Sequence, residues 1–229
     1  AAQPEFRSQP SNLSADFREV TLLPPVGGDE ALVRDYLLHF FVEDESYEGF
    51  APFIRDSFLK PIFAEAKLVN GVGDPGKWYS LISPTAVQDL KERVDIDFAK
   101  SNPENFSPAD DVSLSVHLKN VSDLLVKVYE INTENYYLDR KREINTDLNL
   151  DGLIANEEKS YQYDTDPIRR TSQTFAFDSL KGRRGVWVIE FIGNGMSSRA
   201  LIRKGNLQLL TRTTAAGAIA TVLDGNNQK

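Results

Sequence analysis

Residues 112–119 read VSLSVHLK, and apolar and polar side chains alternate along the whole stretch. Its even-numbered positions are all apolar, whereas its odd-numbered positions are all polar. Successive side chains of a β-strand point to opposite faces of the sheet. The stretch therefore predicts a strand with one face in a core and the other face toward solvent.

Similar short segments follow at regular intervals, with turn residues between them. Gly193-Asn194-Gly195 indicates a tight hairpin between two of these segments. The predicted strands are 94–98, 112–119, 124–131, 161–163, 171–177, 186–192, 198–203, 207–211 and 218–223. This spacing is typical of an antiparallel β-sandwich, so we predict a mainly β fold with the sandwich at residues 93–207.

The sequence before the sandwich has a helical pattern. Residues 29–92 form a predicted helical segment, in which Leu32, Val33, Tyr36, Leu37, Phe40 and Phe41 make one apolar stripe. Pro61 is expected to kink the helical stretch or to begin a new helix. Residues 1–28 are interpreted as a linker or extended arm. Residues 208–229 are interpreted as the start of a following strand or domain that is cut short.

Composition excludes several classes of function. The net charge of −8 and the pI near 4.9 disfavour nucleic acid as a partner, because a negative field repels phosphates. No apolar run approaches the roughly 20 residues that a membrane-spanning helix needs, so we predict no membrane insertion. The absence of cysteine excludes a disulfide framework, a thiolate nucleophile and a zinc–thiolate site.

Residues 71–76 read GVGDPG, which matches the glycine pattern of dinucleotide-binding loops. That chemistry requires a strand before the loop and a helix that opens inside it. Here a helical segment precedes the loop, and Pro75 removes a backbone donor. We therefore interpret the stretch as a connection between helices.

Residues 147–158 leave a calcium site open as an alternative. Asp147, Asn149, Asp151 and Glu158 occupy ligand positions of a twelve-residue calcium loop, and Gly152 permits its sharp turn. The leucines between these positions also fit an alternating strand with its acids in solvent. Whether the four residues bind calcium is undecided by the sequence.

No set of residues forms a recognisable catalytic constellation. His39 and His117 lie in unlike predicted elements, and no nucleophile-elbow motif is present. Trp187, Ile189 and Phe191 share one strand face, which favours core packing over a sugar-binding platform. We accordingly predict no catalytic, cofactor-binding or metal residues and no enzymatic activity.

Four segments together resemble a known family. They are LLVKVYEINT at 124–133, DLNLDGL at 147–153, RGVWVIEF at 184–191 and SRALIRKG at 198–205. This pattern is similar to a macroglobulin-type β-sandwich of bacterial alpha-2-macroglobulin-like proteins, and the resemblance covers residues 93–223. It implies a macroglobulin- or immunoglobulin-like sandwich. The N-terminal helical segment, which is predicted from the residue pattern, is not a usual part of such a sandwich.

The resemblance also implies a function and a setting. The chain would be a non-catalytic scaffold or protein-interaction module of a larger, protease-trapping protein that is periplasmic or extracellular. Its partners would be neighbouring domains of the parent chain and a target protease. Without cysteine the chain lacks the family's thioester. A calcium-dependent or carbohydrate-binding module is the alternative function.

Overall fold

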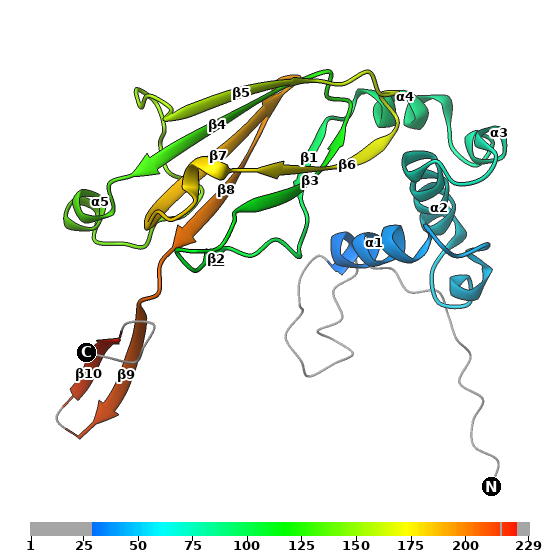
Figure 1. The fold of residues 1–229 in the computed structure, drawn as a ribbon. Coiled ribbons are helices and arrows are strands. Elements are labelled where there is room, and N and C mark those ends of the chain that lie inside the picture. The colour runs from blue at the N-terminus through cyan, green and yellow to red at the C-terminus, as the bar shows by residue number, and fades with distance from the viewer. Residues whose placement is uncertain (1–28, 216, 224–229) are drawn as a thin grey trace, which may run out of the picture. The chain divides into compact units, whose positions relative to one another are not determined.

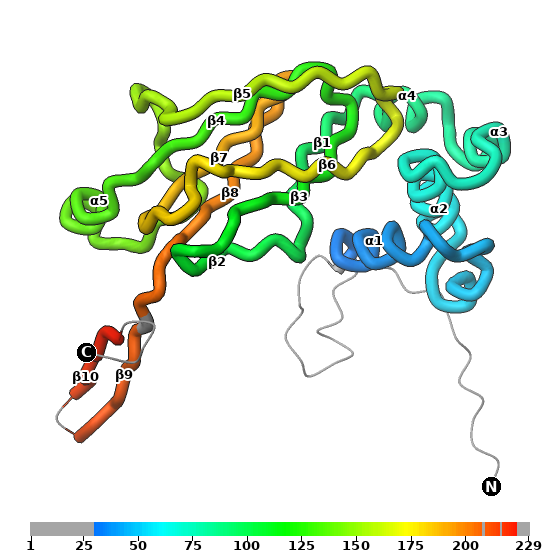
Figure 2. The backbone as a smooth tube through the Cα atoms, viewed as in Figure 1, coloured from blue at the N-terminus to red at the C-terminus, as the bar shows by residue number. Residues whose placement is uncertain are grey.

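The computed structural model describes residues 29–215 and 217–223 (Figure 1). The chain divides into two compact units, which are considered separately below. The helical unit comprises residues up to Arg93 together with Asp166–Arg170, and the β unit comprises Val94–Thr165 and the residues from Thr171 onward. A short piece of the predicted sandwich region thus belongs to the helical unit. Figure 2 shows the same chain path as a continuous backbone.

Local capping signals set the ends of the helices in the helical unit. Its elements are α1 (Asp29–Phe40), the 3-10 turn η1 (Glu48–Phe50), α2 (Asp56–Asn70), α3 (Pro75–Tyr79) and α4 (Pro84–Glu92). The Ser83 side chain caps α4 by accepting a hydrogen bond from the backbone N–H of Ala86, and the Asp74 side chain caps α3 in the same way. The GVGDPG stretch is therefore a connection between helices, as predicted.

The structure removes one of the two alternatives for Pro61 and divides the predicted apolar stripe. Pro61 lies inside the continuous helix α2 rather than at the start of a new one. The apolar stripe of α1 also divides between two surroundings. Leu37 and the following Phe41 are buried, whereas Leu32, Tyr36 and Phe40 are exposed. Their spacing of four residues places these three side chains on one face of α1.

The core of the helical unit is completed by a distant piece of chain. Phe63 and Trp78 pack edge to face within it, and Ile168, about a hundred residues further along the chain, is 2% exposed there. The neighbouring Arg169 donates a hydrogen bond to the carbonyl of Leu68 at the end of α2. Residues 166–170 therefore act as a strap that belongs to the helical unit.

The β unit is an antiparallel sandwich of two sheets, which confirms the predicted fold class (Figure 1). Its smaller sheet has the order β1 (Asp95–Phe98), β3 (Ser113–Lys119), β6 (Arg170–Ala176). Its larger sheet has the order β2 (Asn105–Phe106), β8 (Met196–Lys204), β7 (Gly185–Gly193), β4 (Asp123–Ile131), β5 (Glu157–Gln162). All neighbours of known register are antiparallel except β2 and β8, which run parallel.

The two sheets enclose one core and a second cluster lies outside it. Trp187, Ile189 and Phe191 are fully buried in the core, so the prediction that they pack rather than bind is confirmed. A smaller cluster, which includes Ile144 and Leu201, covers the opposite face of the larger sheet. The hairpin turn between β7 and β8 has Asn194 at φ 42° and Gly195 at φ 81°, as the Asn-Gly signal predicted.

Several elements were not anticipated from the sequence. They are the two-residue strand β2, the helix α5 (Thr133–Arg140) and the 3-10 turn η2 (Asp178–Leu180). After the sandwich, β9 (Gln208–Thr214) and β10 (Gly217–Leu223) pair with each other and with no other described strand. No helix within residues 29–215 and 217–223 is long and apolar enough to cross a membrane.

Candidate functional site

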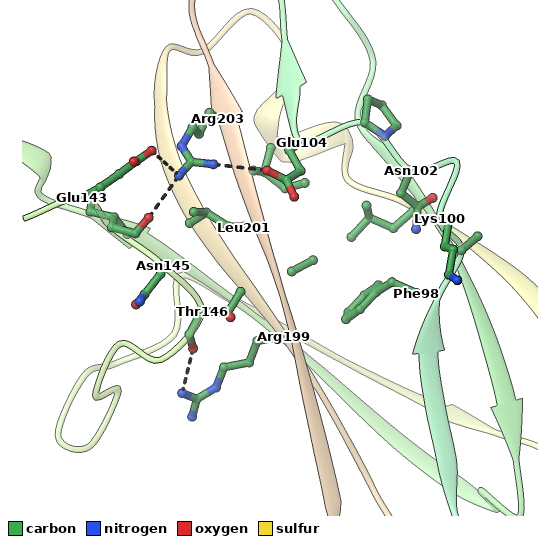
Figure 3. A pocket seen from close by; sticks show the side chains of 16 residues that line it. Phe98, Lys100, Asn102, Glu104, Glu143, Asn145, Thr146, Arg199, Leu201 and Arg203 are labelled. Atoms are coloured by element: carbon green, nitrogen blue, oxygen red, sulfur yellow. Dashed lines mark hydrogen bonds and ion pairs between the residues drawn. The ribbon is translucent and has the colours of Figure 1, made fainter. Parts of the chain in front are cut away.

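A cleft of about 650 Å³ opens along β8 in the β unit (Figure 3). The strand forms its floor, with residues 98–104 on one side and residues 143–146 on the other. Its lining residues are Phe98, Ala99, Lys100, Asn102, Pro103, Glu104, Leu114, Glu143, Ile144, Asn145, Thr146, Arg199, Ala200, Leu201, Ile202 and Arg203.

The floor of the cleft is the open edge of a sheet. β7 pairs with β8 along its whole length, but on the other side β2 covers only Arg203 and Lys204. The backbone N–H of Arg203 donates to the carbonyl of Glu104 at 2.9 Å, so the backbone of this residue faces away from β7. Since backbone groups alternate between the two edges of a strand, those of Arg199 and Leu201 face the cleft as well. Among the described residues, no strand pairs with them there.

One wall of the cleft, residues 143–146, is fixed by two arginines that β8 presents four positions apart. Arg203 donates to the Glu143 carboxylate and to the Ile144 carbonyl, both at 3.0 Å. Arg199 donates to the carbonyl of Leu148 at 2.9 Å. Ile144 is 1% exposed in the same apolar cluster as Leu201. The wall is therefore anchored by packing as well as by hydrogen bonds.

Arg199 is itself held by a buried carboxylate. Glu190 lies directly opposite Arg199 in the β7–β8 register. Its Oε1 atom accepts from Arg199 Nε at 2.8 Å, from Arg199 Nη2 at 2.7 Å and from the Ser197 hydroxyl at 2.9 Å. A buried charge requires such partners. The ion pair thus holds β8 to β7, and it also orients Arg199 toward the segment that forms the wall.

The opposite wall depends on one amide side chain. Asn102 Nδ2 donates to the Ser115 carbonyl and Asn102 Oδ1 accepts from the Ser115 N–H, each at 2.8 Å. This side chain therefore imitates a neighbouring strand of β3 after β1 has ended. The main chain at residues 99–104 turns away from β8 as a result, and rejoins it at Asn105. Phe98 closes the inner end of the wall by packing edge to face on Phe191.

The cleft offers hydrogen-bonding and apolar groups rather than a reactive centre. Its cationic and acidic side chains are Lys100, Glu104, Glu143, Arg199 and Arg203. The two arginines are engaged by Glu190, Glu143 and Glu104 and by backbone carbonyls. The partly buried Phe98 and Ala200 supply an apolar surface on the core side.

The possible calcium ligands do not meet in the structure. Glu158 lies on β5 and forms an ion pair with Lys127, 3.2 Å away on β4. Asp147 and Asp151 take part in local turns through Asn145 and Asn149. In the part of the chain that the structure describes, no three histidines or carboxylates form a group that could hold a metal ion.

The cleft was missed by the sequence reasoning, although one signal was present. Arg199, Leu201 and Arg203 are two positions apart, so their side chains lie on the same face of a strand. Two long cationic side chains therefore flank one apolar residue on that face. Glu143, Asn145 and Thr146 gave no signal, because they lie in a connection whose course follows from tertiary contacts.

The two units match different families. Residues 1–94 match the family described as the actin-binding protein F N-terminal domain. Residues 124–205 match the AbpF first immunoglobulin-like domain. Actin-binding protein F from Dictyostelium discoideum is 42% identical over 203 residues, which are 88% of this chain. The chain is similar to actin-binding protein F. It spans 9% of the length of that relative.

The likeness to macroglobulins is confined to remote structures. Two crystal structures of Escherichia coli alpha-2-macroglobulin resemble 59% of this chain, at 11% and 10% identity. The matched regions are 46% and 71% of those two macroglobulin chains, and the TM-scores are 0.42 and 0.40. The family match of residues 124–205 supports the immunoglobulin-like character of the sandwich, and the sequence relative is actin-binding protein F rather than a bacterial alpha-2-macroglobulin.

Proposed function

We propose that this chain is a non-catalytic protein-interaction module that contributes actin binding to a longer protein. The observation that carries the proposal is the 42% identity to actin-binding protein F, which extends over 88% of the chain and therefore over both units. Identity at this level over so long a stretch supports a shared role as well as a shared fold.

The exposed face of α1 supports the proposal and gives it a place for a test. Leu32, Tyr36 and Phe40 are about half exposed and follow one another at intervals of four residues. The rings of Tyr36 and Phe40 stack with their centroids 6.5 Å apart. Exposed aromatic patches are typical of protein contact surfaces. We call this group the α1 stripe.

The test is co-sedimentation of the full chain with filamentous actin. The chain is expected to pellet saturably with the filaments and to remain in the supernatant without them. The double variant Tyr36→Ser/Phe40→Ser should lower the bound fraction about tenfold, since it removes two aromatic contacts. Phe53→Ser is the matched control, because Phe53 is an exposed aromatic of the same unit outside the α1 stripe.

Two results would overturn parts of this proposal. A chain that stays in the supernatant at every actin concentration is not an actin-binding module. Equal losses in the stripe variant and in Phe53→Ser would show that the α1 stripe is not the contact surface. Circular dichroism of each variant separates lost binding from lost folding.

The competing hypothesis is a scaffold role in a protease-trapping, macroglobulin-type parent. It rests on the resemblance of residues 124–133, 147–153, 184–191 and 198–205 to that family. It predicts that the longer native protein retains a protease after being cleaved by it. Release of the protease into solution after cleavage would remove this hypothesis.

We also propose that residues 208–223 belong to a following domain. β9 and β10 leave Leu209 and Val222 exposed as a directly opposed pair. An isolated two-stranded hairpin is marginally stable in water at best. The relative extends far beyond the matched region, which allows further strands to cover this pair.

A further inference from the structure

The cleft along β8 has a shape suited to one extended chain. The open backbone groups of Arg199 and Leu201 lie on its floor, with residues 143–146 on one side of β8 and residues 98–104 on the other (Figure 3). Leu201 packs with Ile144 on one face of the sheet, whereas Ala200 packs with the core near Phe98 on the other. β1 also approaches β8, and β2 pairs with its end, so a partner chain would pair with β8 over the short open stretch at Arg199 and Leu201.

The same walls exclude two other occupants. A second copy of this chain would have to bring a whole sheet edge between them, and both walls rise beside the edge that it would need. A small anion such as phosphate would find the two guanidinium groups already engaged. Arg199 binds Glu190, and Arg203 binds Glu143 and Glu104. The free capacity of the cleft lies in its backbone and its apolar surface.

We propose that this cleft binds an extended peptide segment of a partner protein, which adds to the larger sheet as a strand beside β8. The main-chain groups of the peptide pair with those of Arg199 and Leu201. Alternate side chains of the peptide face Phe98 and Ala200, so they are apolar. This inference goes beyond actin binding and does not depend on it.

Charge at the rim adds a second element of recognition. Lys100 is exposed on the wall formed by residues 98–104, and it forms no ion pair with any described residue. The acids near β8 are in contrast paired with the arginines. The partner segment therefore carries an acidic residue at the end that reaches Lys100.

The test uses the full chain labelled with ¹⁵N and a terminally blocked hexapeptide that begins with glutamate and continues with alternating valine and threonine. Nuclear magnetic resonance titration is expected to give saturable shifts of the Arg199 and Leu201 amides. Their exchange with solvent should slow about tenfold when the peptide is bound, because each gains a hydrogen bond. The Arg203 amide is the internal control, since it already donates to Glu104.

Two further peptides test whether the backbone carries the binding. One is N-methylated at every valine and the other at every threonine. Only one of these two sets of amides can face β8, because backbone groups alternate between the edges of a strand. Strand addition therefore predicts that one peptide loses affinity about tenfold or more while the other retains it. Equal affinities of the two peptides would overturn the proposal.

A charge exchange tests the role of Lys100. Replacing the glutamate of the peptide by lysine should weaken binding several-fold, and Lys100→Glu in the protein should restore it. Absence of any saturable shift at millimolar peptide would overturn the proposal as a whole. Actin co-sedimentation by Lys100→Glu is expected to be unchanged, so failure of either proposal can be recognised without the other.

Discussion

At the scale of single residues, the buried Glu190 carboxylate forms an ion pair with Arg199, and this pair should contribute to the stability of the β unit. Arg199→Met leaves the buried Glu190 carboxylate without its cation, which should lower the free energy of unfolding by about 3 kcal/mol. Urea denaturation measures this change. Arg199→Met/Glu190→Met should recover most of it, because the unpaired charge is gone.

A matched control for this prediction is Lys181→Met. Lys181 pairs with Asp111 at 2.9 Å, but both side chains are more than half exposed. Its loss should leave the free energy of unfolding almost unchanged, because water screens an exposed ion pair. If both variants lose the same stability, the Glu190–Arg199 pair has no special role.

Glu157 makes the stability of the β unit depend on pH. Hydrogen bonds from the Lys159 ammonium and the Ser179 hydroxyl hold the pKa of Glu157 below its ordinary value of 4.5. A carboxyl whose pKa is lowered by folding stabilises the protein above the unfolded-state pKa, and this stabilisation is lost as the pH falls through the folded-state pKa.

The variant Ser179→Ala tests this dependence. It should lower the free energy of unfolding by about 1 kcal/mol at about pH 7, and by less at about pH 2, where the carboxyl is protonated in both states. Denaturant titrations at the two pH values measure the difference. A loss that does not change with pH would mean that the hydroxyl does not act through the Glu157 carboxylate.

Some single residues were readable from the sequence and others were not. The Asn194-Gly195 turn depends on neighbours a few positions away, so the local pattern was sufficient to predict it. Asn102 and Glu190 act on residues that only the tertiary fold brings near. The residues next to Asn102 in the sequence give no indication that its side chain will bind the backbone of β3.

At the scale of elements, the strap at residues 166–170 is the least expected feature. Ile168→Ala should destabilise the helical unit by about 3 kcal/mol, because it removes a buried side chain from a closed core. Ile154→Ala is the control, since Ile154 is 92% exposed. Thermal unfolding followed at 222 nm compares the two variants. Equal midpoints would show that the strap does not stabilise the helices.

The strands were predicted better than the elements that connect them. Alternation and turn residues identified β3, β4, β7 and β8, because one face of each meets a core. β2 has only two residues, which is too short for any periodicity. The helix α5 begins at an Asn132 cap but buries none of its residues, so it has no apolar stripe to reveal it.

At the scale of the whole molecule, the hairpin of β9 and β10 should be the least protected β structure. Hydrogen exchange measured by mass spectrometry is expected to label residues 209–215 and 217–223 within seconds, and residues 186–192 far more slowly. A chain extended by the residues that follow it in the parent protein should slow exchange in the hairpin. Unchanged exchange in the extended chain would contradict the proposed following domain.

The division of the chain was only partly accessible from sequence. The change from helical to alternating pattern near residue 93 coincides with the boundary at Val94. The hydrophobic pattern of residues 166–170 does not indicate that they pack on the helical unit. Their partner Leu68 is about a hundred positions away, and such a contact cannot be predicted from neighbouring residues. The family resemblance anticipated the type of sandwich but not the family of its sequence relative.

The parallel pairing of β2 with β8 determines how the β unit would respond to mechanical load. The chain enters this unit at Val94 and leaves the sandwich after Lys204, so tension applied through the two ends acts first on β1 and its pairing with β3. Once β1 has left β3, the same tension pulls the parallel strands β2 and β8 past each other in shear. That load falls on two residue pairs and on the ion pairs of Arg203. A pull strong enough to part them would uncover more of β8 before the rest of the sandwich opens. In a protein under tension, the length of open edge would then depend on the force.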